Sequence, residues 1–220
     1  MRRGVVSEVF ATESAAQRYG DLLAGSPLHL VTERAAKALS DTVNPAGLVA
    51  VCSVPDTSLS DVLAGRPTLL AVPVGVSEPG NAGTLIRVAD AMGADAVVLA
   101  GHSVDPYNGK CLRASAGSIF SVPVVSESDG VGVVTQIRDA GLQVLATALD
   151  GDVSLDDAEL AVPTAWLFGP EAHGLPADLV DLATHRVHIP MRGGAESLNV
   201  ASAASICLYQ SAQAHRRIGG

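Results

Sequence analysis

Residues 68–87 have the sequence TLLAVPVGVSEPGNAGTLIR, in which an apolar run enters a Pro-Gly-Asn-Ala-Gly turn and then a helical pattern. The apolar run predicts a strand over 68–76, and the pattern after the turn predicts a helix over 82–92. Asn81 is a good N-cap for that helix, and backbone amides beside glycines at a helix N-terminus bind anions. Arg87 lies among apolar neighbours, so it either pairs with a carboxylate or points toward a ligand. The segment therefore predicts one unit of an α/β fold with a candidate anion site at the turn.

Strand and helix patterns alternate along most of the chain. The other predicted strands are 28–31, 48–52, 96–99, 122–125, 143–148, 165–168 and 186–189, and the other predicted helices are 33–39, 59–64, 132–140, 177–182 and 200–216. The later strands are continuous apolar runs, as expected where helices cover both faces of a parallel sheet. The sequence thus predicts an α/β fold with a parallel sheet sandwiched by helices. A nicotinamide-dependent oxidoreductase on a dinucleotide-binding sheet is a rival, disfavoured because the glycine fingerprint is incomplete.

A domain boundary is predicted at the sequence Ala64-Gly65-Arg66-Pro67, where a short helix ends and a proline precedes the next strand. This boundary divides the chain into a small domain, residues 1–65, and a larger domain, residues 66–220. About 65 residues are few for an independent hydrophobic core, so the small domain is expected to depend on the larger one for stability.

The composition of the 220 residues excludes several classes of protein. Hydrophobic residues make up 48% of the chain and charged residues 17%, which excludes global disorder. No apolar run reaches the roughly 18 to 20 residues that cross a bilayer, and no signal peptide is visible, so we predict a cytoplasmic protein without membrane contact. The three cysteines lie far apart without zinc-type spacing, which argues against a disulfide framework and against a metal site.

The net charge of −9 argues against a protein that coats nucleic acid by bulk electrostatics. Twelve of the 14 basic residues are arginine, whose planar fork suits phosphate, although genomic composition gives the same bias. Five carboxylates between residues 150 and 159 are expected to form a solvated loop rather than a metal site. Lys110 and Arg113 lie at helical spacing in DPYNGKCLRASAGSIF, residues 105–120. They form a compact basic face that suits phosphate contacts, and a solvated helix surface is the alternative.

Two further glycine-containing segments follow predicted strands. Residues 167–176 have the sequence LFGPEAHGLP, and residues 189–200 have the sequence IPMRGGAESLNV. In open α/β sheets the loops after the carboxyl ends of strands hold the ligand, which makes Glu171 a candidate site residue. A plain connection between strand and helix is the alternative for the first segment. For Asn199 in the second segment, the alternative is N-capping of the last helix.

Taken in order, these four segments resemble the SpoU (TrmH-like) family of RNA ribose methyltransferases in the SPOUT superfamily, in its ribosomal RNA branch. The matching residues are Asn81, Gly83 and Arg87 in the first family motif, Gly169, Glu171, Gly174 and Leu175 in the second, and 189–191 with 197–200 in the third. The stretch from Lys110 to Phe120 also matches. The resemblance spans about residues 67–215, and three motifs in the right order are far more specific than any one of them.

The resemblance implies a fold and a site that periodicity could not show. Related enzymes thread the C-terminal part of the sheet into a deep trefoil knot, which is very rare in other folds. The knot forms the pocket for S-adenosyl-L-methionine, and no metal is implied. The implied cofactor-binding residues are Thr147, Ala148, Gly169, Pro170, Glu171, Ile189, Pro190, Met191, Ser197 and Leu198. The implied catalytic residues are Arg87, Asn81, Glu171 and Asn199, and the implied RNA contacts are Lys110, Arg113 and Arg192.

The implied function is S-adenosylmethionine-dependent methylation of a ribose 2′-hydroxyl in structured RNA, with ribosomal RNA preferred over transfer RNA as the substrate. The alternatives are a transfer RNA ribose methyltransferase and a non-catalytic RNA-binding relative. The second is disfavoured because residues of all three motifs are present. Residues 1–65 resemble a shortened α/β form of the RNA-recruiting domain of ribosomal RNA members, without its usual leading helix.

The last helix predicts a homodimer, which the resemblance also implies. Small and apolar residues form a band on this helix that is wider than one core-facing stripe needs. The members of the band are Ala203, Ala204, Cys207, Leu208, Gln210 and Ser211. Surplus apolar surface on a sheet of this size favours self-association about a two-fold axis. Related enzymes build each active site from both subunits.

Overall fold

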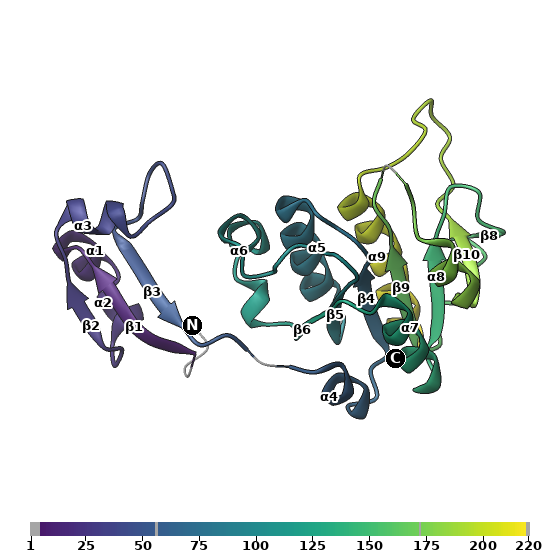
Figure 1. Ribbon diagram of the computed structural model, residues 1–220, viewed down its shortest axis with the longest axis horizontal. Coiled ribbons are helices and arrows are strands. Elements are labelled where there is room, and N and C mark those ends of the chain that lie inside the picture. Colours follow the sequence, from purple (N-terminus) through teal and green to yellow (C-terminus); the bar gives the residue numbers. More distant parts are fainter. Residues whose placement is uncertain (1–4, 56, 172, 219–220) are drawn as a thin grey trace. The chain divides into compact units, whose positions relative to one another are not determined.

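The computed structural model describes residues 5–55, 57–171 and 173–218, and the chain forms two compact units (Figure 1). The division falls between residues 56 and 57, earlier than the boundary predicted at residue 65. Helix α4 (Leu59–Ala64) belongs to the larger unit because Leu59 is buried in its core, with Val62 and Leu63 packed against that core. The division between the two units therefore precedes α4, whereas the predicted boundary follows it.

The smaller unit is a three-stranded sheet with three short helices. Strand β1 (Val6–Ala11) lies in the centre, parallel to β2 (Leu28–Leu30) and antiparallel to β3 (Leu48–Cys52). The helices are α1 (Glu13–Arg18), α2 (Gly20–Leu23) and α3 (Glu33–Ala38). Its buried apolar side chains come from the sheet and from all three helices: Val9, Ala11, Ala15, Leu23 and Ala36. The strands near 28 and 48 and the helix near 33 were expected, whereas β1, α1 and α2 are additional.

The larger unit contains a seven-stranded sheet in which all paired strands are parallel. Its strands are β4 (Leu69–Pro73), β5 (Ala96–Ala100), β6 (Val124–Glu127), β7 (Gln143–Thr147), β8 (Val153–Ser154), β9 (Thr164–Phe168) and β10 (His185–His188). Their order across the sheet is β6-β5-β4-β9-β7-β10-β8. Every residue of β4, β5 and β9 is buried, which explains why these strands have continuous apolar sequences. The predicted parallel sheet is confirmed.

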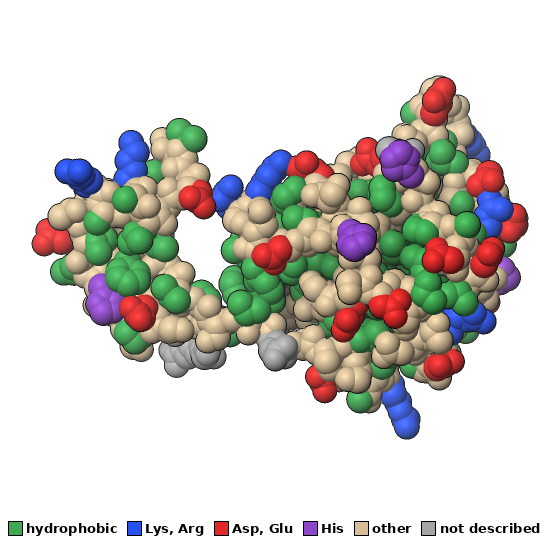
Figure 2. Space-filling view, in the orientation of Figure 1, with side chains coloured by type: hydrophobic (Ala, Val, Ile, Leu, Met, Phe, Trp, Pro, Cys, Tyr) green, Lys and Arg blue, Asp and Glu red, His purple; other side chains and the backbone are tan. Residues whose placement is uncertain are grey.

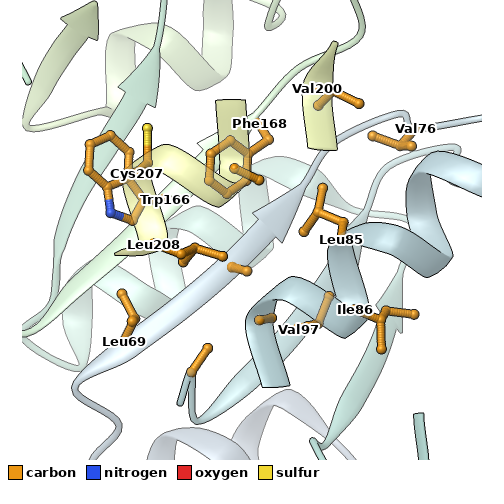
Figure 3. Close-up of a cluster of buried hydrophobic side chains, with 14 of the residues drawn as sticks. Leu69, Val76, Leu85, Ile86, Val97, Trp166, Phe168, Val200, Cys207 and Leu208 are labelled. Carbon is orange, nitrogen blue, oxygen red and sulfur yellow. The ribbon is translucent and has the colours of Figure 1, made fainter. Parts of the chain in front are cut away.

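Helices cover both faces of this sheet (Figure 1). One core contains side chains of α5 (Pro79–Met92), α6 (Gly109–Ser115), α9 (Val200–Ile218) and the 3-10 turn Ser118–Phe120; the other contains side chains of α4, α7 (Gly130–Asp139) and α8 (Ala177–Leu182). In the first core, Trp166 and Phe168 of β9 stack with ring centroids 6.3 Å apart, and Cys207 and Leu208 of α9 lie in the same cluster (Figure 3). The Trp166 indole N–H donates to Ser211 Oγ at 2.9 Å, so the buried ring has its polar group satisfied.

Helix α5 begins at Pro79 rather than at residue 82. Proline suits the first helical position, because its fixed φ matches the helix and its missing N–H has no partner there, and Glu78 is the N-cap. Asn81 lies inside the first turn, so its predicted role as the N-cap is wrong. Further along, a Cβ on Gly83 would lie 2.4 Å from Cys111 O and 2.6 Å from Ala114 Cβ. Gly83 therefore permits the close approach of α5 and α6.

Strand β10 lies between β7 and β8, although β7 and β8 follow one another in the sequence. Ala148 N donates to Val187 O, and Leu155 N donates to His188 O, so the chain that leaves β7 runs along β10. Strand β8 has only two residues, too few to show a period, and the sequence does not predict it.

Helix α9 uses most of the predicted self-association band for the core of its own unit. Ala204, Cys207, Leu208 and Ser211 have no exposed surface, so a second subunit could not contact them. The large apolar side chains that α9 exposes are instead Ile206 and Tyr209, at 37% and 48%. Burial therefore excludes Ala204, Cys207, Leu208 and Ser211 from the predicted dimer interface, whereas Ala203 is half-buried and Gln210 is exposed.

Candidate active site

A pocket lies at the carboxyl ends of β7, β9 and β10. The residues that line it are Thr147, Ala148, Leu149, Gly169, Pro170, Glu171, Gly174, Val187, Ile189, Met191, Ser197, Leu198, Val200 and Ala203. Of the ten predicted cofactor-binding residues, all but Pro190 line this pocket. Three loops that are distant in the sequence thus meet at one edge of the sheet, where open α/β folds hold their ligands.

Two glycines shape the loop after β9 that forms one wall of the pocket. A Cβ on Gly169 would lie 2.7 Å from both Gly174 C and Leu175 N, closer than real Cβ contacts. Gly174 has φ +66°, in the left-handed region that favours glycine, and its N–H donates to Pro170 O at 2.9 Å. The loop can therefore turn back on itself only with glycine at these two positions.

A hydrogen-bond network joins three of the four predicted catalytic residues. Asn199 Nδ2 donates to Asn81 Oδ1 at 3.0 Å and to Glu171 Oε1 at 2.9 Å. Glu171 Oε1 also accepts the backbone N–H of Val200 at 3.0 Å. Asn199 Oδ1 accepts the backbone N–H of Ala201 at 3.0 Å, which is the contact of an N-cap for α9. Asn199 therefore both caps α9 and connects the residues of the site.

Arg87, the fourth predicted catalytic residue, lies outside this network. It is exposed on α5, and it forms no ion pair with any residue that the structure describes. Glu171, a predicted catalytic residue, accepts hydrogen bonds from Asn199 and Val200. Of the two roles considered for Arg87, pairing with a carboxylate is thus not seen in the described part of the chain, and its guanidinium is available to a ligand.

The predicted RNA contacts Lys110, Arg113 and Arg192 are exposed side chains. Lys110 Nζ forms an ion pair with Glu78 Oε1, which joins the start of α6 to the start of α5. The hydrogen bond from Lys110, and then its positive charge, lower the pKa of the Glu78 carboxyl. Figure 2 shows the Lys and Arg side chains of the larger unit scattered among Asp and Glu on this face rather than gathered into one patch. The basic face predicted around Lys110 is therefore partly neutralised by Glu78.

Sequence reasoning does not assign five of the residues that line the pocket: Leu149, Gly174, Val187, Val200 and Ala203. A usable signal existed for three of them. Gly174 and Val200 lie inside the motif segments, and Leu149 directly follows a predicted strand end. Val187 and Ala203 carry no such signal, because a small or apolar residue in a strand or helix is equally suited to the core.

The described residues contain no group of three or more His, Cys, Asp or Glu side chains placed to hold a metal ion. In the acidic segment 150–159, Asp150 and Asp152 pair with Arg186 instead. No helix in the described ranges is long and apolar enough to cross a membrane.

Comparison with known proteins extends these observations. The profile of the SpoU rRNA Methylase family matches residues 68–209. The 23S rRNA (guanosine(2553)-2'-O)-methyltransferase RlmP of Bacillus subtilis is 35% identical over 94% of this chain and 80% of its own length. The 23S rRNA (uridine(2479)-2'-O)-methyltransferase of Streptomyces viridochromogenes is 36% identical over 80% of this chain and 62% of its own length. The similarity is therefore strong, and it spans between about three fifths and four fifths of these two relatives.

Solved structures show the same similarity in three dimensions. The SpoU methyltransferase AviRb from Streptomyces viridochromogenes, in complex with the cofactor AdoMet, has a TM-score of 0.84 at 30% identity and covers 98% of this chain and 84% of its own. The AdoMet-bound rRNA methyltransferase from Sinorhizobium meliloti has a TM-score of 0.83 at 29% identity, with coverage of 94% and 80%. The structural similarity thus extends beyond residues 68–209 to nearly the whole chain.

Proposed function

This chain belongs to the SpoU rRNA methylase family, and from that premise we propose that it methylates the 2′-hydroxyl of a ribose in ribosomal RNA, with S-adenosyl-L-methionine as the methyl donor. The observation that carries the proposal is the meeting of the motif segments: residues of the second and third motifs line one pocket, and Asn199 joins them to Asn81 of the first. Similar proteins that act on 23S rRNA and similar structures that hold AdoMet support it. We place the activity in the cytoplasm.

The pocket suits S-adenosylmethionine in its chemistry. Apolar side chains of Leu149, Val187, Ile189 and Leu198 form much of its wall, and a few polar groups stand among them, as in most pockets for small ligands. Gly169 lets the loop after β9 fold tightly against Gly174 and Leu175, and both Gly169 and Gly174 line the pocket. When bound, the cofactor supplies a methyl group on a sulfonium, which is already activated for transfer.

Methyl transfer to a hydroxyl is an in-line displacement, in which the hydroxyl oxygen must be oriented and must lose its proton. We assign Arg87 to the ribose 2′-hydroxyl or to the adjacent phosphate. A guanidinium stays protonated in proteins, so Arg87 would orient and stabilise these groups rather than remove a proton. Its exposure, without an ion pair to a described residue, supports this role.

Asn81, Glu171 and Asn199 are proposed to hold the site together. Glu171 accepts two hydrogen bonds from the start of α9, which fixes the loop after β9 against that helix. Asn199 connects this loop to α5, and α5 carries Arg87. These three residues would therefore set the position of the cofactor pocket relative to Arg87.

Lys110, Arg113 and Arg192 are proposed to contact RNA phosphates, and residues 1–65 are proposed to recruit the RNA. For Lys110 this requires exchange of Glu78 for a phosphate group, which an exposed ion pair permits at little cost. Phosphate contacts from a few exposed basic side chains fix the register of the RNA without a net positive charge on the whole protein.

We also propose that the C-terminal part of the larger unit forms a deep trefoil knot. The position of β10 between β7 and β8 supports it, because a later strand then lies inside an earlier loop of the chain. After β10 the chain returns to the core that α5 and β9 share, where α9 packs. Knotted threading of this kind is otherwise very rare.

The active form is proposed to be a homodimer that uses the exposed side of α9. Ile206 and Tyr209 present apolar surface on that helix, and Leu149 and Met191 present it at the pocket. Apolar surface of this kind is commonly covered by a second copy of the chain in a two-fold assembly. A second subunit at this place would complete the site, as the family resemblance implies.

A methylation assay tests the proposed function. The purified protein is incubated with methyl-labelled S-adenosylmethionine and with 23S rRNA, ribosomal subunits or transfer RNA, and labelled nucleotides are mapped. We expect cofactor binding by calorimetry and label at a ribose 2′-oxygen of ribosomal RNA. Label in transfer RNA alone would reassign the substrate. Cofactor binding without transfer to any RNA would indicate a non-catalytic relative, and absence of binding would reject the proposal.

A further inference from the structure

Side chains of β10 fasten the chain that leaves β7. Arg186 Nη2 donates to Asp150 O at 2.9 Å and lies 2.5 Å from Asp150 Oδ1, and Arg186 Nη1 is 3.8 Å from Asp152 Oδ1. His188 Nδ1 donates to Gly151 O at 2.9 Å, since a carbonyl oxygen can only accept. We call Arg186, His188 and their partners in residues 150–152 the β10 clasp.

The clasped chain lies directly on the backbone of β10. A Cβ on Gly151 would be 2.7 Å from His188 N and 2.8 Å from Arg186 O, so no larger residue fits there without displacement. Ala148 N donates to Val187 O at 3.0 Å, two residues before the clasp begins. The segment is therefore held against β10 at Ala148, Asp150 and Gly151.

The clasp lies next to two walls of the pocket. Ala148 and Leu149, which directly precede Asp150, line one wall, and Val187, which lies between Arg186 and His188, lines another. Side chains alternate between the two faces of a strand, so Arg186 and His188 share the face of β10 opposite to Val187. Arg186 is not among the residues that line the pocket, so an effect of Arg186 on a ligand must act through these walls.

We propose that Arg186 is a positioning residue for the binding of S-adenosylmethionine: by holding Asp150, it fixes the wall of Ala148 and Leu149 at the distance from Val187 that the cofactor needs. The inference rests on the proposed function, because it takes this pocket as the cofactor site. The hydrogen bond from Arg186 lowers the pKa of the Asp150 carboxyl, so the pair stays charged at neutral pH and below.

The exposure of the Arg186–Asp150 ion pair indicates that it positions the loop and contributes little to the stability of the whole protein. The Asp150 side chain is 85% exposed and that of Arg186 is 32% exposed. An ion pair so accessible to water contributes little to the free energy of unfolding. The hydrogen bond from Arg186 to the Asp150 carbonyl holds the loop, and Gly151 packs directly on the backbone of β10. The loss of Arg186 should therefore loosen residues 148–152 and leave the sheet intact.

Calorimetric titration with S-adenosylmethionine tests the proposal on the full chain. Arg186→Ala is expected to weaken binding by about 3- to 30-fold, the range of energetic coupling between neighbouring parts of a fold. Arg186→Lys should recover part of the affinity, because an ammonium can still pair with Asp150 but lacks the two-pronged geometry. Arg138→Ala is the matched control, since Arg138 is exposed on α7 and pairs with no residue in the described ranges.

Amide hydrogen exchange without cofactor supplies a second measurement. Exchange over residues 147–153 should be faster in Arg186→Ala than in Arg138→Ala, while both variants keep melting temperatures close to each other. If Arg186→Ala does not fold, Arg186→Lys and Asp150→Asn provide the same comparison. Affinity or exchange equal to the control would overturn the role of Arg186. A wild-type chain that binds no cofactor would overturn the proposed function as well, so the two failures are distinguishable.

Discussion

The side-chain amide of Asn199 donates to Asn81 Oδ1 at 3.0 Å, across 118 positions of the sequence. The same Nδ2 group donates its other hydrogen to Glu171 Oε1. Asn199 Oδ1 accepts the backbone N–H groups of Ala201 and Ser202, which establishes which end of the amide is oxygen. One side chain thus caps α9, receives the loop after β9 and reaches the first turn of α5.

Asn199→Asp should therefore separate helix capping from assembly of the site. Aspartate caps a helix as well as asparagine does. It cannot donate to Asn81, and it brings a second negative charge next to Glu171, which is unfavourable. We expect near-normal helix content and a loss of methyl transfer of about a hundredfold or more, the scale of one preorganised contact. Ser202→Ala, just inside the same helix, is the control; normal turnover in Asn199→Asp would contradict the role of this network.

Arg87→Ala is expected to keep S-adenosylmethionine binding and to lose methyl transfer by at least about a hundredfold. The reason is that Arg87 is exposed on α5 and lies outside the residues that line the pocket. Calorimetry and a labelled-methyl assay on the same preparation measure the two quantities. Near-normal turnover would remove Arg87 from the catalytic set, and a collapse of cofactor affinity would give it a structural role instead.

Gly83→Ala should destabilise the protein although alanine is the better helix former. Its Cβ would meet Cys111 O at 2.4 Å, and the backbone of α6 cannot yield cheaply. Overpacking of this kind costs about 1–3 kcal/mol of unfolding free energy, more than the gain of roughly 1 kcal/mol in helix propensity. Gly80→Ala on the same helix is the control, because its Cβ would lie 3.7 Å from Glu78 Oε1 and 3.8 Å from Lys110 Cε, at ordinary contact distances. Urea unfolding should show a lower free energy of unfolding for Gly83→Ala than for the wild type, and no such loss for Gly80→Ala.

Cys207 predicts how stability changes at alkaline pH. Burial raises the pKa of this thiol to about 12 from its usual 9.0. Above pH 9 the unfolded chain loses the thiol proton while the folded chain keeps it, so stability is complete below pH 9 and falls as the pH rises toward 12. The stability difference between the wild type and Cys207→Ala should therefore shrink by about 2 kcal/mol between pH 8 and pH 10.5. Urea unfolding at the two pH values measures it; a constant difference would contradict the assignment.

Ile206→Asp tests the proposed dimer. A charge on the exposed side of α9 should oppose burial of Ile206 and Tyr209 against a second copy. Light scattering at micromolar concentration is expected to give about 45 kDa for the wild type and a mass near 22.3 kDa for the variant. Val131→Asp, at an exposed apolar residue of α7, is the control and should stay dimeric. An active wild type at monomer mass would exclude the interface and the shared site.

The strands of the larger unit could be predicted because burial on both faces makes each one a continuous apolar run, as in Ala96–Ala100. Strand β1 (Val6–Ala11) was not predicted because polar residues interrupt its apolar run, and β8 was not predicted because two residues are too few to form a pattern. The start of α5 was misplaced because Pro79 suits a turn as well as the first position of a helix. The place of β10 in the sheet depends on long-range pairing, which no local pattern encodes.

Residues of the candidate pocket could be named because the motif segments resemble a known family, and the structure places nine of the ten in one wall or another. The ion pairs that support the pocket and its neighbouring helices could not be predicted from the sequence. Lys110 lies 32 positions from Glu78, and Arg186 lies 36 positions from Asp150. Charged pairs at such separations have no spacing that distinguishes them from solvated side chains, so only the folded chain reveals them.

The central position of β4 has a consequence for the order of folding during synthesis. Leu69 of β4 pairs with Thr164 of β9, about 95 positions later, whereas β5 follows β4 closely. At translation rates of roughly 5 to 20 residues per second, β4 leaves the ribosome about 5 to 20 s before β9 exists. During this interval one edge of an apolar strand has no partner, and such an edge pairs readily with other chains. The nascent protein is therefore most prone to aggregate before residue 164 emerges, a hazard that disappears once β9 has closed the sheet.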